Sequence, residues 1–112
     1  MQVTAVKTAS LVENVHHVKA SKLYDTAHAQ VIHITLEPGE SMRRHITPVD
    51  VFFYVIEGEG IVEVGDEKQS VGPDTLINSP ANIPHCWYNE SGGTVRFLVV
   101  KVPRPSKPTK LL

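Results

Sequence analysis

The chain has 112 residues, of which 41% are hydrophobic and 21% are charged, with a formal net charge of −1 and a pI of about 6.6. This length fits one domain with a single core and argues against a multi-domain machine. The near-neutral charge argues against nucleic acid and an anionic membrane as main partners, because both require a clustered cationic surface.

The apolar residues favour strands over helices. There are 16 Val, 7 Ile and 8 Thr, against 7 Leu and 6 Ala. β-branched side chains lose rotamer freedom in helices and pack well on a pleated sheet. Seven Gly and eight Pro supply frequent breaks. The composition therefore predicts an all-β protein built from many short strands.

Targeting and redox signals are few. No apolar run approaches the ~20 residues needed to span a bilayer. Residues 1–5 do not begin a basic region followed by an apolar stretch, as a secretory signal would. The single cysteine, Cys86, permits no intrachain disulfide. We therefore expect a cytoplasmic protein without a membrane partner.

The first half of the chain contains one clear strand pattern. Residues 1–24 are mixed and predict one or two edge strands. Residues 30–36 alternate cleanly, with Ile32, Ile34 and Leu36 on one face, which is typical of a half-buried strand. Turn residues at 37–40 end this strand.

The second half is a series of short strands separated by turns. Residues 51–56 form a continuous apolar run and predict a central strand covered on both faces. Gly65-Asp66 is a two-residue hairpin signal between strands at 61–64 and 67–71. Further strands are expected at 75–79, 85–89 and 94–102, followed by a Pro-rich extended tail over 103–112. No helical periodicity is present, so the pattern predicts a sandwich or barrel of jelly-roll type.

Two spaced motifs resemble those of the cupin superfamily. They read Gly39-x5-His45-x-Thr47-x3-Val51-x6-Gly58 and Asp74-x5-Pro80-x-Asn82-x2-His85-x3-Asn89. The resemblance spans about residues 30–102 and is that of a small, single-domain, RmlC-like cupin of the cupin_2 type. It implies a double-stranded β-helix at 30–102, preceded by edge strands and a dimerisation segment at 1–29 and followed by the tail at 103–112.

Metal binding is the chemistry that the resemblance raises first. Cupin metal sites usually use two His and a Glu from the first motif and a His from the second. Here His45 and His85 are kept, whereas Thr47 stands at the other His position and Val51 at the Glu position. Asp74 and Asn82 replace motif-two glycines, which is a mild change because Asp and Asn tolerate positive φ.

If the motif spacing holds, His45 and His85 both point into the barrel mouth, where they can bind Fe, Ni, Mn, Cu or Zn. Asp50 is the candidate third ligand. Strand alternation turns Asp50 outward if Val51 faces inward, unless a bulge intervenes. The alternative is that the two histidines are hydrogen-bonded pocket residues without a metal.

The predicted pocket also contains Thr47, Val51, Phe53 and Trp87, which share the inward parity of the histidines. For Phe53 the core is the preferred interpretation, whereas Trp87 fits the pocket and the core alike. Arg44 is either a solvated loop residue or a clamp for an anionic substrate.

Other candidates receive a structural interpretation. Cys86 is expected to be a small buried side chain between the sheets. The remaining histidines, His16, His17, His28 and His33, follow no motif and are expected at the surface or an interface.

Three functions are consistent with these residues. The first is a weakly metal-dependent dioxygenase, isomerase or lyase acting on a small organic metabolite. The second is a non-catalytic module that binds a sugar or an organic acid and has a degenerate metal site. The third is an accessory protein whose main role is assembly. Whether the chain is an enzyme stays open at this point.

A homodimer is the expected assembly. The resemblance implies it, because small cupins are usually dimers. Phe52, Tyr54 and Ile56 have outward parity, and such an apolar row requires a cover. The segment 1–29 is the candidate for exchange between subunits.

Overall fold

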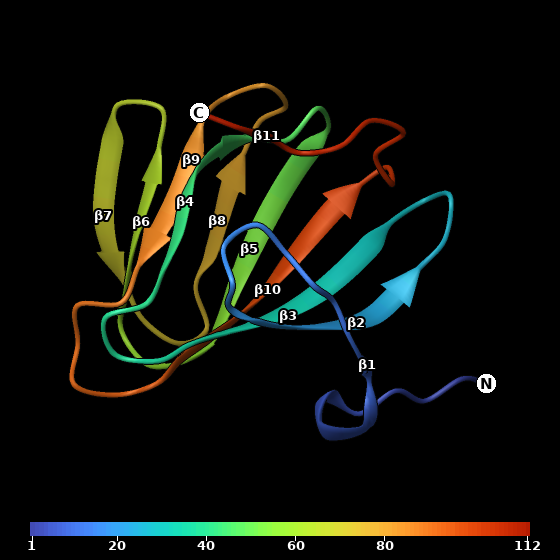
Figure 1. Cartoon of the computed structure of the whole chain (residues 1–112), viewed down its shortest axis with the longest axis horizontal. Helices are drawn as coiled ribbons and strands as arrows, with labels where there is room; N and C mark the ends of the chain where they lie inside the picture. Colours follow the sequence, from blue (N-terminus) through green and yellow to red (C-terminus); the bar gives the residue numbers. More distant parts are fainter.

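The computed structural model describes residues 1–112 and consists almost entirely of strands, as predicted (Figure 1). A single 3-10 turn, η1, covers Val6–Thr8. The strands are β1 (Ser10–Leu11), β2 (Lys19–Asp25), β3 (Gln30–Leu36), β4 (Ser41–Ile46), β5 (Asp50–Glu57), β6 (Gly60–Val64), β7 (Glu67–Val71), β8 (Leu76–Ser79), β9 (His85–Tyr88), β10 (Val95–Val102) and β11 (Lys110–Leu111). The structure contains no helix with the length and hydropathy required to cross a membrane.

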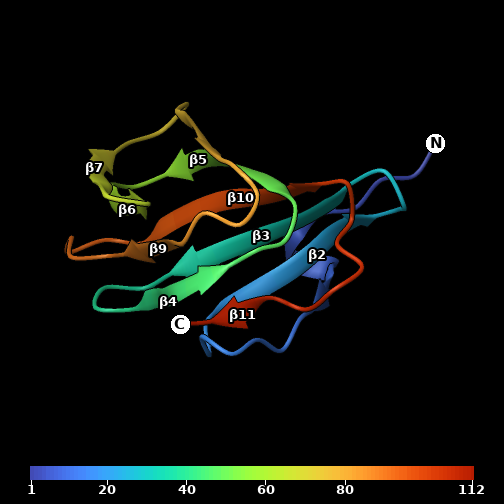
Figure 2. The ribbon, with the colours of Figure 1, turned by 90° about the horizontal axis from the view of Figure 1, so that it is seen from above.

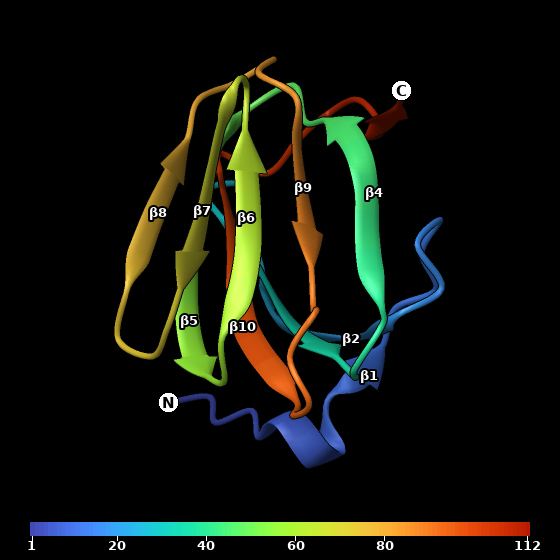
Figure 3. The ribbon, with the colours of Figure 1, turned by 90° about the vertical axis from the view of Figure 1, so that its left-hand side faces the viewer.

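The strands form two sheets that pack face to face. The six-stranded sheet has the order β1-β2-β3-β10-β5-β8, and the five-stranded sheet has the order β11-β4-β9-β6-β7. Figure 3 shows β4, β9, β6 and β7 lying in front of β5 and β10. All neighbouring strands are antiparallel.

Strand alternation places the core between the two sheets. On β5, Val51, Phe53 and Val55 are at most 2% exposed, and on β10 Val95 and Phe97 are fully buried. The opposite face of β5 is only half-buried. The sequence predicted that both faces of this strand would be covered, but within one chain only the face toward the core is fully buried.

Strand β4 was not predicted, because its residues do not alternate. Met42 pairs with Trp87 and His45 pairs with His85, so three steps along β4 match two steps along β9. A β-bulge at Arg43-Arg44 absorbs the extra residue. The bulge lets Met42 and His45 both face inward, although an odd number of steps separates them.

Both terminal segments return to the barrel. β1 pairs with β2, and β2 extends the six-stranded sheet beside β3. The tail runs back from β10 and ends as β11 beside β4, where Leu111 pairs with His45 (Figure 2). The predicted extended tail is thus docked on the edge of the five-stranded sheet.

Tight turns explain the non-standard residues of the motifs. Asp74 and Asn82 have positive φ values of 61° and 66°. These residues are the non-glycine types that tolerate the left-handed region best, so the turns are kept. Gly58 has a φ of 82°, and a Cβ there would collide with the Thr94 carbonyl oxygen.

Candidate functional site

A cavity of about 320 Å³ lies between the sheets, next to both terminal segments. Its walls are mainly apolar and include Ile32, Ile34, Met42 and Val99. The N-terminal loop at 12–16 and the tail residues Pro108 and Thr109 line it as well. A largely apolar hollow with a few polar groups is typical of a small-molecule site.

His45 and His85 lie side by side in this cavity. They are directly paired residues of β4 and β9, and they are 4% and 2% exposed. Their Nε2 atoms are 3.0 Å apart, and their ring centroids are 4.4 Å apart. The structure therefore brings together the two histidines that the motif spacing singled out.

The hydrogen-bond partners assign the protons of this pair. His45 Nδ1 lies 2.6 Å from the Arg43 carbonyl oxygen, which can only accept, so this nitrogen carries the proton. The Nε2 atom of neutral His45 then accepts a hydrogen bond from His85 Nε2–H. The Ser79 hydroxyl, 2.7 Å from His85 Nδ1, donates to that nitrogen. All four ring nitrogens are satisfied without another group.

Both imidazoles are held in the neutral form. Burial lowers the pKa of His85 to about 3, and the charges of His45 and Lys101 add to this effect. Burial also lowers the pKa of His45, although the hydrogen bond to the Arg43 carbonyl opposes the shift. The pair is thus uncharged near pH 7.

His16 is a site residue that the sequence analysis missed. It was expected at the surface or an interface, and it is half-buried, because the N-terminal loop carries its ring to within 4.7 Å of the His45 ring, measured between centroids. The Arg43 backbone N–H donates to His16 Nδ1 over 2.8 Å. Neutral His16 therefore has its proton on Nε2, and burial lowers its pKa to about 4.

The bulge on β4 organises both of these histidines. The Arg43 backbone N–H donates to His16, and the Arg43 carbonyl accepts from His45. In a regular strand these two backbone groups would form hydrogen bonds with the neighbouring strand. No sequence signal marks His16, because it lies outside both motifs and meets His45 only through the tertiary fold.

Lys101 is the second residue that the sequence analysis missed. It is directly paired with Val51 on β5 and with Gln30 on β3, and it lines the cavity. Its ammonium forms no ion pair. Burial lowers its pKa.

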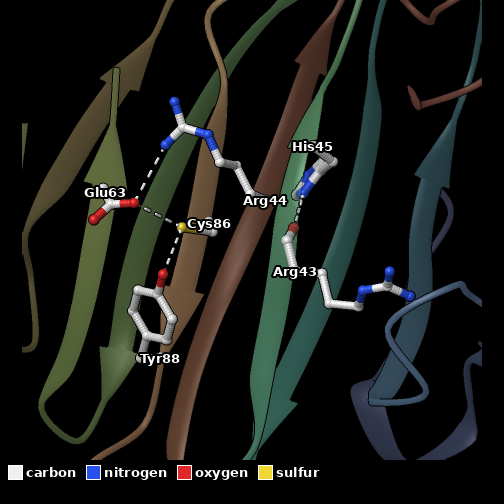
Figure 4. A network of polar contacts seen from close by, with 6 residues as sticks. All are labelled: Arg43, Arg44, His45, Glu63, Cys86 and Tyr88. Atoms are coloured by element: carbon white, nitrogen blue, oxygen red, sulfur yellow. Dashed lines mark hydrogen bonds and ion pairs between the residues drawn. The ribbon is translucent and has the colours of Figure 1, made fainter. Parts of the chain in front are cut away.

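Asp50 and Arg44 lie away from the cavity. Asp50 is exposed, and its carboxylate accepts a hydrogen bond of 2.9 Å from the Ala81 backbone N–H. Regular alternation along β5 therefore turns Asp50 outward, and no bulge brings it into the cavity. Arg44 forms an ion pair of 3.3 Å with Glu63 on the outer face of the five-stranded sheet (Figure 4). The structure thus places neither the candidate third ligand nor the candidate anion clamp beside the histidines.

The remaining pocket candidates divide into one lining residue and three core residues. Thr47 lines the cavity, with Oγ1 3.4 Å from His85 Nε2. The other three, Val51, Phe53 and Trp87, are buried but do not line it. The Phe53 ring packs against that of His85 with centroids 5.2 Å apart, and Trp87 stacks on Phe97 at 4.0 Å. These rings pack behind the histidines, which is why the pocket assignment fails for them.

Two further residues complete the comparison with the predictions. Cys86 is fully buried, as predicted, but it lies on the outer face of the five-stranded sheet beside Glu63 and Tyr88 and not between the sheets, because β9 alternates and Trp87 takes the inward face (Figure 4). Burial raises the pKa of its thiol. His33 is 1% exposed, so the surface prediction for it is wrong. Its Nε2 lies 3.0 Å from an Arg96 guanidinium nitrogen, and this side chain covers it.

The donor set fits only part of a metal site. Two nitrogens about 2.1 Å from a metal and at right angles would lie about 3.0 Å apart, as the two Nε2 atoms do. No third ligand follows, since the structure contains no group of three His, Cys, Asp or Glu side chains around one point. His16 Nδ1 is occupied by Arg43, and the Lys101 ammonium opposes a second cation. The residues therefore do not fit a metal held by protein ligands alone.

Comparisons with known proteins place the chain in a family. The family model described as Cupin domain matches residues 32–101. The uncharacterized protein MJ0764 of Methanocaldococcus jannaschii is 32% identical over 87 residues, which are 77% of this chain and 75% of that protein.

Solved structures agree with this placement. The MJ0764 structure, described as an RmlC-like cupin with a double-stranded β-helix fold, has a TM-score of 0.74 at 27% identity, covering 88% of this chain and 92% of that one. TT1209 of Thermus thermophilus has a TM-score of 0.80 at 28% identity, covering 94% and 100%. The polyketide cyclase RemF of Streptomyces resistomycificus has a TM-score of 0.85 at 23% identity, covering 100% and 85%. The chain therefore belongs to the cupin family, and its two sheets form the double-stranded β-helix.

Proposed function

We propose that this cupin is a binding module that holds a small organic molecule in its cavity, without a resident metal. The observation that carries the proposal is the neutral His45–His85 pair inside a mainly apolar hollow of about 320 Å³. The apolar walls supply the affinity through burial, the two imidazole rings form part of the wall, and the Thr47 hydroxyl supplies a polar contact that orients the ligand.

A binding assay with a matched control tests this function. Fragments are titrated against the protein, and backbone amide shifts in NMR spectra locate the bound fragments. We expect binding at the cavity that His45→Ala and His85→Ala weaken at least fivefold, whereas His28→Ala, a change at an exposed histidine, leaves it unaltered. Binding that is indifferent to both cavity variants would contradict the proposal.

A metal-dependent enzyme of dioxygenase, isomerase or lyase type is the second candidate. Two observations favour it: the 3.0 Å separation of the Nε2 atoms, and the hydrogen bond that His45 Nδ1–H donates to the Arg43 carbonyl, which is the support that metal-ligating histidines usually have. His45 and His85 would hold the metal, which would polarise a ligand carbonyl. The likeness to RemF is below 25% identity and supports the fold alone.

Metal analysis separates the two candidates. The protein is purified without added metal and analysed by mass spectrometry for Fe, Ni, Mn, Cu and Zn, beside the His45→Ala, His85→Ala and His28→Ala variants. The binding module predicts less than about a tenth of an equivalent in every sample. Near-stoichiometric metal that only the two cavity variants lose would establish the second candidate instead.

A homodimer is the assembly that we propose. The outer face of the six-stranded sheet pairs Leu98 with Tyr54 and Val100 with Phe52, and Leu76 beside Tyr54 is 57% exposed. A second copy would cover this apolar row. Light scattering at micromolar concentration should give twice the chain mass, and Leu76→Glu should reduce it. A monomer mass for the unaltered protein would contradict the proposal.

A further inference from the structure

Lys101 gives the cavity a positive charge that no neighbouring group neutralises. Its place on β10 follows strict alternation with Val95, Phe97 and Val99, all of which face the interior. Lys101 therefore points inward at the end of the strand, where it lines the cavity. The positive charge of Lys101 contributes to the lowered pKa of His16, His45 and His85, which line the same cavity.

The groups around Lys101 offer no carboxylate. Its direct cross-strand neighbours are Val51 and Gln30, which are both uncharged. The carboxylate among the lining residues belongs to Glu13, which is exposed on the N-terminal loop and forms no ion pair with Lys101. A partly buried cation without a counter-charge is costly, and an anion that enters the cavity offsets this cost.

The rest of the cavity restricts the body of such an anion. Ile32, Ile34 and Val99 form an apolar wall on the same sheet as Lys101. A volume of about 320 Å³ holds about ten groups of the size of a water molecule, at about 30 Å³ each. The ligand that fits is a small molecule of roughly ten non-hydrogen atoms with an apolar body.

We infer that the cavity binds a small monocarboxylic acid, whose carboxylate pairs with the Lys101 ammonium and whose apolar body lies against Ile32, Ile34 and Val99. This inference rests on the proposed small-molecule function and names its ligand class. Lys101 is a specificity-determining residue in this arrangement. The ion pair forms away from bulk water, where its strength exceeds that of a surface pair.

Matched acids and amides test the charge requirement. Benzoate, trans-cinnamate and other monocarboxylates of roughly this size are titrated against the protein beside their primary amides, with dissociation constants taken from NMR shifts of the cavity amides. We expect the acids to bind at least tenfold more tightly than the amides. Lys101→Met should abolish this preference without weakening amide binding, and Lys107→Met, at an exposed lysine of the tail, should leave it intact.

A second variant covers the case in which Lys101→Met does not fold. Gln30→Glu places a carboxylate on a half-buried lining residue that is directly paired with Lys101, and it should abolish the preference for acids while the lysine is retained. Equal binding of acids and amides, or a preference that survives both variants, would overturn the carboxylate site and leave the small-molecule function standing. If no compound of either kind shifts the cavity amides, both are overturned.

Discussion

Acid should destabilise this protein through its buried histidines, and His85 allows the effect to be measured for one residue. Its pKa is about 3 in the folded chain, against an ordinary value of 6.5. Between these two values the unfolded chain binds the proton and the folded chain does not. The free energy of unfolding therefore falls as the pH drops below about 6.5, and this loss levels off only below about pH 3.

The size of the effect follows from proton linkage. Between pH 7 and pH 5, His85 should remove about 2 kcal/mol of stability. The unfolded pKa determines most of this figure, because at pH 5 a folded pKa of 3 or 4 leaves the folded histidine almost wholly neutral. His16, with a pKa of about 4, acts in the same direction, so the comparison needs a variant that removes only the titration of His85.

Urea denaturation followed by the fluorescence of Trp87, the single buried tryptophan, measures the stability at both pH values. His85→Gln should have a pH dependence smaller by about 2 kcal/mol than that of the unaltered protein. His28→Gln, at an exposed position, should retain the full dependence. If His85→Gln loses as much stability between pH 7 and pH 5 as the unaltered protein, the reasoning about the buried neutral pair is wrong.

Three further substitutions test the surroundings of the site. Ser79→Ala should lower the free energy of unfolding at pH 7 by about 1–3 kcal/mol, because His85 Nδ1 loses its buried donor; an unchanged urea midpoint would argue against that hydrogen bond. Asp50→Ala should leave fragment affinity and metal content as they are, since this carboxylate points away from the cavity; a fivefold loss of either would show that Asp50 acts there. Gly58→Ala should lower the thermal midpoint strongly, at a cost of about 1–3 kcal/mol or more, because its positive φ and the Thr94 carbonyl leave no room for Cβ; a midpoint within a degree of the original would refute this.

Local patterns were enough to predict most of the barrel. The alternation over 30–36 coincides with β3, and the strand predicted at 94–102 differs from β10 by one residue. The resemblance of the motif spacing to that of the cupins also predicted that His45 and His85 lie together, although β4, which carries His45, is interrupted by a bulge. The sequence therefore determined the all-β class, most of the strands and the central histidine pair.

The tertiary structure decided the rest of the site. His16 reaches His45 only because a bulge at Arg43-Arg44 frees one backbone N–H for it, and neither a bulge nor a partner 27 residues away has a local signature. Lys101 has the same inward parity as Phe97, but only the pairing of β10 with β3 and β5 shows that its end of the strand opens on a cavity without a facing carboxylate. Periodicity records which face of a strand a residue occupies, whereas the charge and shape of a pocket depend on contacts between strands that are distant in the chain.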